Sequence, residues 1–303
     1  KLYDPYGFPV DLAADVARER GLTVDMPGFE AEMTKQRERA RQAGDFKTTQ
    51  QGVAIGEATE FVGYEQLENT SVIQAIIKEG KLVNSIDAGD EAIVVLAQSS
   101  FYGESGGQVG DNGLLSNADI TFEVSNTQKQ KSGAFEHYGV LNGGTLSVGD
   151  AVEAVVDKHR RKRIARNHSA THLLHAALRS VLGETVTQKG SLVDGDKLRF
   201  DFSHDDVISK TDLDKIEGMV NRKILGNTKI YTDVTDIESA KKKGAMALFG
   251  EKYGDTVRVL TMGKDDFSVE LCGGTHVERL GDIGLFRITS EGGIAAGVRR
   301  IEA

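Results

Sequence analysis

Two short motifs carry the residues of this chain that are best suited to chemistry. His168 and His172 are four positions apart, so in a helix their side chains share one face. A second pair with the same spacing, Cys272 and His276, stands on a glycine-bearing turn 100 positions further on (272 − 172). Imidazole and thiolate are ligands that suit zinc, so these four residues form a candidate His3Cys zinc site.

Other interpretations of these residues remain open. His168 and His172 could be ordinary helix histidines, with Cys272 a small buried apolar residue. A zinc peptidase is excluded, because the glutamate of the H-E-x-x-H pattern is replaced by Ser169. His175 lies about one step of the helical wheel off the shared face and is expected to be a supporting or core residue.

Composition indicates a packed globular protein. The chain has 303 residues, 39% of them apolar and 27% charged, which suits two or three domains. No apolar run could span a bilayer and the start lacks a signal-peptide core, so we expect neither membrane insertion nor secretion. With a single cysteine no internal disulfide can form, which fits a cytoplasmic protein. A net charge of −9 argues against a globally basic nucleic-acid binder and leaves local patches to decide.

We expect an α+β protein in three parts: a helical segment over 1–58, a glycine-rich β-barrel over 59–157 and a third domain over 158–303. In the first part, helices are predicted at about 11–20 and from near Pro27 to Gly44. The second helix carries a basic run, Lys35, Arg37, Arg39 and Arg41. This run is interpreted either as a solvated helix face or as a surface that faces a nucleic acid.

The middle part has short strand-like runs separated by glycine. These runs cover 71–77, 91–97, 120–124 and 151–156, and the pattern predicts a small antiparallel barrel. The stretch Phe101–Gly113 is too rich in glycine to be only a strand. It is not a phosphate loop either, because no lysine follows the glycines and no helical pattern opens after them.

The third part begins with a basic run over 159–166 that leads into a long helix ending at Gly183. A second helix is predicted at about 211–225. Strand-like or glycine-rich stretches are expected at 185–188, 197–202, 230–234, 257–262, 285–290, 292–293 and 299–301. Together these elements predict a two-layer α+β domain in which helices cover one face of a sheet.

Several long blocks of sequence resemble bacterial alanyl-tRNA synthetases over essentially the whole chain. The blocks His168–Leu178 and Val186–Ser191 resemble the editing domain of that family. Further blocks match it in order and spacing: Gly244–Tyr253, Glu270–His276, Gly281–Gly284 and Gly297–Ala303. Leu2–Pro9 resembles the end of the tRNA-recognition region, and Glu104–Gln108 resembles the barrel that precedes the editing domain. Threonyl-tRNA synthetases are similar relatives.

The resemblance implies hydrolysis of the ester that joins serine or glycine to alanine tRNA, with zinc as the cofactor. It also implies that Thr171 and Gln188 line the amino-acid pocket, where Gln188 could bond a serine hydroxyl that alanine lacks. Zinc could activate water or anchor the substrate, and anchoring is preferred because four protein ligands leave little room for hydroxide. The family's charging core and oligomerisation region are not represented in this sequence.

The alanine tRNA acceptor end is the expected partner. Its candidate contacts are Arg160, Arg161, Lys162, Arg163, Arg166, Ser105, Gly106, Gly107 and Gln108. A solvated helix start is the alternative for each basic residue. Thr171 could instead bond its own helix backbone, and Gln188 could face solvent. A competing hypothesis of a different class is a non-catalytic RNA-binding domain in which zinc only holds the fold.

Overall fold

A computed structural model describes residues 58–246 and 256–303, together with isolated positions between 17 and 29. The chain divides into two compact units, Lys1–Gly52 and Val53–Ala303. The helices expected at 11–20 and 27–44 lie almost entirely outside the described residues and stay predictions. The second unit contains the barrel and all four candidate metal ligands. No described helix combines the length and the apolar character needed to cross a membrane.

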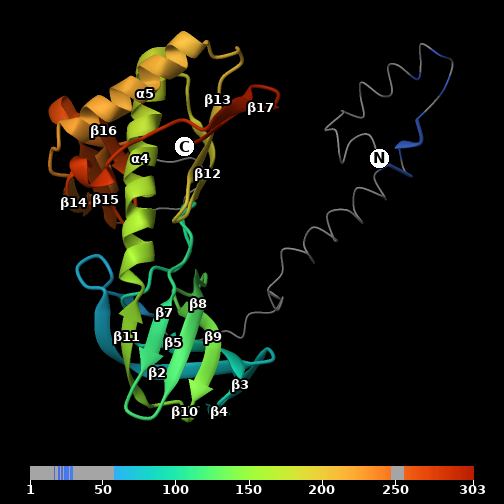
Figure 1. Ribbon diagram of the computed structural model, residues 1–303, viewed down its shortest axis with the longest axis vertical. Helices are drawn as coiled ribbons and strands as arrows, with labels where there is room; N and C mark the ends of the chain where they lie inside the picture. Colours follow the sequence, from blue (N-terminus) through green and yellow to red (C-terminus); the bar gives the residue numbers. More distant parts are fainter. Residues whose placement is uncertain are drawn as a thin grey trace. The chain divides into compact units, whose positions relative to one another are not determined.

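The first half of this unit is the antiparallel barrel that the sequence predicts (Figure 1). Six strands close it in the order β11-β7-β8-β9-β5-β2, and β2 pairs back onto β11. They are β2 (Glu68–Lys78), β5 (Glu91–Leu96), β7 (Gly113–Ser116), β8 (Thr121–Lys129), β9 (Phe135–Gly143) and β11 (Ala151–Val156). Short strands flank them: β1 (Glu60–Phe61), β3 (Lys81–Val83), β4 (Ser85–Asp87), β6 (Gln98–Ser99) and β10 (Thr145–Ser147).

Every second side chain along a strand points into the barrel and fills it. In β11, Val152, Ala154 and Val156 are buried while Ala151 and Glu153 are exposed, as expected when successive residues point to opposite faces. These residues join one apolar cluster with residues of the other strands. The barrel therefore encloses an apolar cluster, beside which a few polar side chains such as His137 and Ser99 are also buried.

The second half is organised around one long helix, α4 (Lys158–Leu182). Asp157 caps it by accepting hydrogen bonds from the backbone N–H groups of His159 and Arg160, and it ends before Gly183. Helix α5 (Lys210–Leu225) packs along it. The remaining helices are short: α6 (Ile237–Lys242), η1 (Lys264–Asp266) and η2 (Leu280–Ile283).

The expected single sheet with helices on one face is wrong. Two separate sheets contact α4, which runs between them (Figure 1). One has the order β12-β13-β18-β17, from β12 (Gln188–Val193), β13 (Leu198–Ser203), β18 (Val298–Glu302) and β17 (Ser290–Ala295). The other has the order β14-β15-β16, from β14 (Tyr231–Asp236), β15 (Thr256–Met262) and β16 (Ser268–Leu271). Every residue from His168 to Leu178 is consequently buried.

Two predicted strands are misplaced. The strand expected at 185–188 starts only at Gln188, and the one expected at 285–290 starts only at Ser290. In the second case side chains of α5 replace a strand partner: Asn221 bonds both backbone polar groups of Phe286, and Glu217 accepts from the N–H of Ile288. Because these backbone groups are satisfied by a helix, the segment stays irregular.

Candidate metal centre

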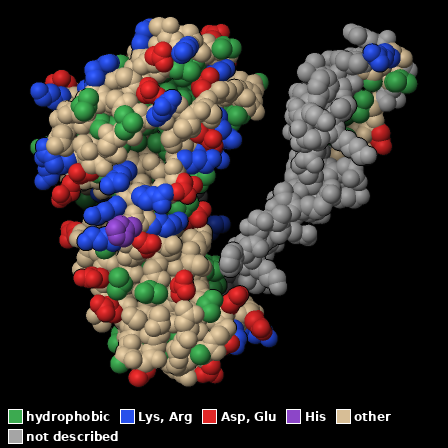
Figure 2. Space-filling model, in the orientation of Figure 1, with side chains coloured by type: hydrophobic (Ala, Val, Ile, Leu, Met, Phe, Trp, Pro, Cys, Tyr) green, Lys and Arg blue, Asp and Glu red, His purple; other side chains and the backbone are tan. Residues whose placement is uncertain are grey.

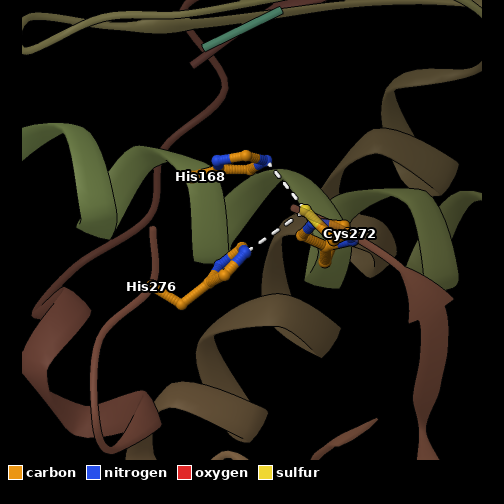
Figure 3. A group of neighbouring side chains, drawn as sticks. His168, Cys272 and His276 are labelled. Carbon is orange, nitrogen blue, oxygen red and sulfur yellow. Dashed lines mark hydrogen bonds between the residues drawn. The ribbon is translucent and has the colours of Figure 1, made fainter. Parts of the chain in front are cut away.

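Four side chains from two distant parts of the chain converge beside α4. His168 and His172 project from successive turns with their rings stacked 5.3 Å apart, while Cys272 and His276 follow β16. One ligand atom from each lies within 4.8 Å of all the others. His168 and His276 point toward Cys272 (Figure 3), with their Nε2 atoms 3.5 and 3.3 Å from its sulfur.

Each of the three imidazoles is oriented by a contact of its Nδ1 atom. The Nδ1 atom of His172 lies 2.8 Å from a Glu270 carboxylate oxygen, and that of His168 lies 2.7 Å from Gln108 Oε1. The Nδ1 atom of His276 lies 3.2 Å from the Ser169 hydroxyl. With Nδ1 occupied in this way, Nε2 of each ring is left to face the centre of the group, an arrangement typical of metal-binding histidines.

The donor set and its spacing fit zinc. The buried Nε2 atoms of His172 and His175 have no hydrogen-bond partner among the described residues, and only that of His172 belongs to the ligand group. A buried polar atom in this state is costly unless a ligand fills it. Tetrahedral bonds of about 2.0–2.3 Å separate ligand atoms by about 3.5 Å. The distances from the Cys272 sulfur to the two Nε2 atoms are close to this value.

Electrostatics favour the ligating protonation states of Cys272 and His276. At His172 burial would lower the pKa, but Glu270 and Cys272 override this effect and raise the pKa to about 10. Burial would raise the pKa of the Cys272 thiol, but the adjacent His168, His172 and His276 lower it well below its ordinary value. Burial lowers the pKa of His276 to about 3, which keeps that ring neutral. Burial would also raise the pKa of Glu270, but His172 overrides this effect and lowers it. A thiolate and neutral imidazole are the forms that bind a metal ion.

Sequence reasoning did not predict that three residues orient the ligands: Glu270, Gln108 and Ser169. Glu270 stands two positions before Cys272, so strand periodicity places it on the same side, a signal that could have identified it. Its carboxylate also meets Nδ1 of His175 at 3.2 Å. His175 is buried against Phe200 and does not join the ligand group, in agreement with its predicted supporting role.

The two candidate pocket residues lie on different elements, α4 and β12. Thr171 is buried, and its hydroxyl donates to the backbone carbonyl of Asn167 at 2.8 Å. Gln188 is half-buried at the start of β12, opposite Phe202. Neither of them lines the cavity beside His276.

That cavity has a volume of about 510 Å3 and lies between the barrel and α4. Thr275 and His276 form part of its wall, so it opens directly beside the ligand group. Lys162 and Arg166, one helical turn apart on α4, also line it. Tyr64 of the barrel is 47% exposed, and its ring is covered by the Arg258 guanidinium at 4.2 Å. The size suits a small-molecule group or a nucleotide end.

The basic residues at the start of α4 do not behave as one patch. Lysine and arginine side chains gather where the barrel meets α4 (Figure 2). Lys162 and Arg166 are exposed, Arg163 pairs with exposed Asp196, and Arg160 donates to the Gly110 carbonyl at 2.7 Å. Arg161 was predicted to contact a tRNA phosphate, but its side chain is buried.

The guanidinium of Arg161 is only 5% exposed and is used inside the protein. It pairs with Asp111 and donates to the carbonyl oxygens of Gly63 and Ser100, both at 2.8 Å. It therefore joins the barrel to α4 and is not available to a tRNA phosphate.

Gln108 is likewise misplaced as a tRNA contact. Its side chain is completely buried and bonds His168 and Thr275. Ser105 and Gly106, in the same turn, are exposed, and Gly107 is half-buried. Only the tip of this turn can meet a partner from outside.

With the barrel, the helix-borne histidines and the cysteine turn in place, comparisons with known proteins define the family. A model described as "tRNA synthetases class II (A)" matches residues 1–160, and one described as "Threonyl and Alanyl tRNA synthetase second additional domain" matches residues 257–302. The chain therefore belongs to the class II tRNA synthetase family.

Curated relatives narrow this likeness to one kind of synthetase. Over all 303 residues the chain is 75% identical to the alanine–tRNA ligase of Ruthia magnifica subsp. Calyptogena magnifica. It is 72% identical, again over its whole length, to the alanine–tRNA ligase of Vesicomyosocius okutanii subsp. Calyptogena okutanii (strain HA). It spans 35% of the length of each relative.

Proposed function

We propose that this chain forms the editing part of an alanine–tRNA ligase and hydrolyses the ester in wrongly charged Ser-tRNA(Ala) and Gly-tRNA(Ala), with residues 158–303 as the zinc-binding editing domain. One observation carries the proposal: ligand atoms of His168, His172, Cys272 and His276 converge within 4.8 Å of one another. Relatives named alanine–tRNA ligases support the choice of tRNA.

His168, His172, Cys272 and His276 would hold the zinc ion. When bound there, zinc supplies a concentrated positive charge that can anchor the amino-acid part of the substrate. The chain's own groups do the rest: Glu270 keeps the His172 ring in place, and the walls of the site position the ester for attack by water.

Selection of serine over alanine is attributed to Thr171 and Gln188. The Gln188 amide would bond the serine hydroxyl and would be left unpaired when alanine is bound. Such a difference discriminates strongly between serine and alanine. The helix hydrogen bond of the Thr171 hydroxyl restrains its rotamer. Its methyl group can then shape the pocket.

The tRNA end is expected to approach through the cavity between the barrel and α4. Lys162 and Arg166 line it and form no ion pair within 58–246 and 256–303, so both are available to acceptor-stem phosphates. Such contacts supply affinity without reading sequence.

A second function, RNA binding with a purely structural zinc, is favoured by one feature. Four protein ligands fill a tetrahedral site, which is typical of closed structural zinc. The editing function therefore requires a displaced ligand, an expanded coordination or an anchoring contact.

Deacylation of purified Ser-tRNA(Ala) separates the two functions. The zinc-loaded chain should release serine, and Cys272→Ala should release it at least about 100-fold more slowly, because losing a ligand costs more than losing a group that only orients one. Circular dichroism checks that both proteins are folded. Binding of tRNA by both proteins without release of serine by either would leave only the RNA-binding function.

A further inference from the structure

A glutamine of the barrel reaches into the metal centre of the other half of the unit. Gln108 is 0% exposed, and its Oε1 lies 2.7 Å from Nδ1 of His168 and 2.9 Å from the backbone nitrogen of Thr275. Its Nε2 donates to the Thr275 hydroxyl at 3.0 Å. One amide thus contacts both the helix and the turn that carry the ligands.

These contacts fix the chemistry of His168. A backbone N–H can donate only to the oxygen of an amide, so the bond from Thr275 identifies the atom facing His168 as Oε1. That oxygen accepts, so Nδ1 of His168 must carry the proton. The lone pair of Nε2 is then directed toward Cys272 Sγ, 3.5 Å away.

The backbone is built to bring Gln108 to this position. Gly106 and Gly107 have φ values of 59° and 84°, the positive values that a two-residue type I′ turn requires. Val193 of β12 donates to the Gly107 carbonyl at 2.7 Å and accepts from the Val109 N–H at 3.1 Å. The turn is therefore fastened to the edge of the four-stranded sheet.

The cysteine turn comes equally close from the other side. A Cβ atom at Gly274 would lie 2.0 Å from the His168 ring, so a side chain here would push the turn away from the helix. Barrel residue Tyr64 also donates to the Gly273 carbonyl at 2.5 Å. The barrel thus contacts the turn between Cys272 and His276 at two places.

We propose that Gln108 is a positioning residue of the metal centre: it sets the tautomer of His168 and holds the Cys272–His276 turn against α4. The barrel completes the metal site through this residue, in place of the tRNA contact predicted for it. The inference rests on the proposed zinc site.

The test is a comparison of metal binding by variants of the whole chain. Gln108→Leu removes the acceptor and should weaken zinc affinity about 10- to 100-fold, the usual effect of losing a group that orients a ligand. The visible spectrum of the Co2+-loaded chain should change with it. Gln108→Glu keeps an acceptor oxygen and should stay close to the original chain in both measurements.

Gln130→Leu is the matched control, since it removes a barrel glutamine that bonds Glu136 rather than a metal ligand. It should leave affinity and spectrum unchanged. A folded Gln108→Leu chain with unaltered zinc affinity and cobalt spectrum would overturn the inference.

A measurement on the unchanged chain covers the case in which Gln108→Leu does not fold. Imidazole 15N NMR of the zinc-loaded chain should show His168 protonated at Nδ1 and bound to metal through Nε2, and metal on Nδ1 would overturn the inference. If the unchanged chain binds no metal ion, the proposed function fails as well, whereas loss of the Gln108 effect alone leaves that function standing.

Discussion

Buried histidines occupy both the barrel and the metal-bearing half, and their surroundings differ in an instructive way. In the barrel, His137 has both nitrogens engaged, with Ser99 Oγ at 2.8 Å and the Val94 carbonyl at 2.9 Å. In the metal-bearing half, His172 is as deeply buried, but its Nε2 has no partner among the described residues. Burial of a histidine therefore says little about its function. A nitrogen left open indicates a ligand only where other ligand atoms converge on it, because Nε2 of His175 is also without a partner among the described residues and lies outside the ligand group.

The two halves should respond differently to loss of metal, which is the largest effect expected. Chelation should abolish release of serine and remove hydrogen-exchange protection around Cys272–His276. Strands β8 and β9 should keep their protection, because the barrel has its own apolar core. α4 should stay folded, since its core cluster extends well beyond the ligands. Global unfolding on chelation would contradict the comparison and favour a purely structural zinc.

Substitution of Arg161 tests the contact between the barrel and α4. Arg161→Met leaves the buried Asp111 carboxylate without its partner Arg161. The free energy of unfolding should therefore fall by about 3–5 kcal/mol in denaturant titrations. Arg163→Met is the control, because its partner Asp196 is exposed and such pairs contribute about 0–1 kcal/mol. Equal effects of the two substitutions would show that the buried pair does not join the barrel to α4.

Acid should destabilise the barrel through His137. Burial lowers the pKa of this residue to about 4 from a usual 6.5, so between these values the unfolded chain binds the extra proton. Stability is complete above pH 6.5 and is lost as the pH falls toward 4, by about 3 kcal/mol in all. The pH dependence of hydrogen exchange in β5 and β9 measures this loss of stability.

His137→Gln serves as the comparison in that experiment, because it removes the titrating group at the same position. The barrel of this variant should lose less stability over the same pH range. An identical loss in both proteins would show that His137 does not cause the acid sensitivity.

The smallest effects are expected at the cavity. Lys162→Ala and Arg166→Ala should each weaken tRNA binding and reduce the slope of log affinity against log salt by about 1. Lys210→Ala, on α5 and outside the cavity, should leave the slope unchanged. If the three variants have equal slopes, the tRNA end does not approach by this route.

Local signals made much of the fold predictable. Glycine-punctuated runs marked β2, β5, β8 and β11, whereas β7 and β9 went unpredicted. In β9, Glu136 and His137 are buried polar residues, and Gly139 and Gly143 interrupt the alternation. Whether 285–290 forms a strand depends on α5 side chains that bond its backbone, which no local pattern reveals.

The candidate site shows the same limit. The spacing within each pair, His168 and His172 or Cys272 and His276, is local and indicated the ligands. The burial of Gln108 and Arg161 arises from contacts 50 or more positions away in the chain, so their side chains looked like exposed polar groups in the sequence.

X-ray absorption at the zinc edge of the metal-loaded chain tests the central claim most directly. The account predicts one zinc ion per chain with one sulfur at about 2.3 Å and three imidazole nitrogens at about 2.0–2.1 Å, and loss of the sulfur contribution in Cys272→Ala. An oxygen-rich coordination without sulfur, or no stoichiometric zinc at all, would contradict it.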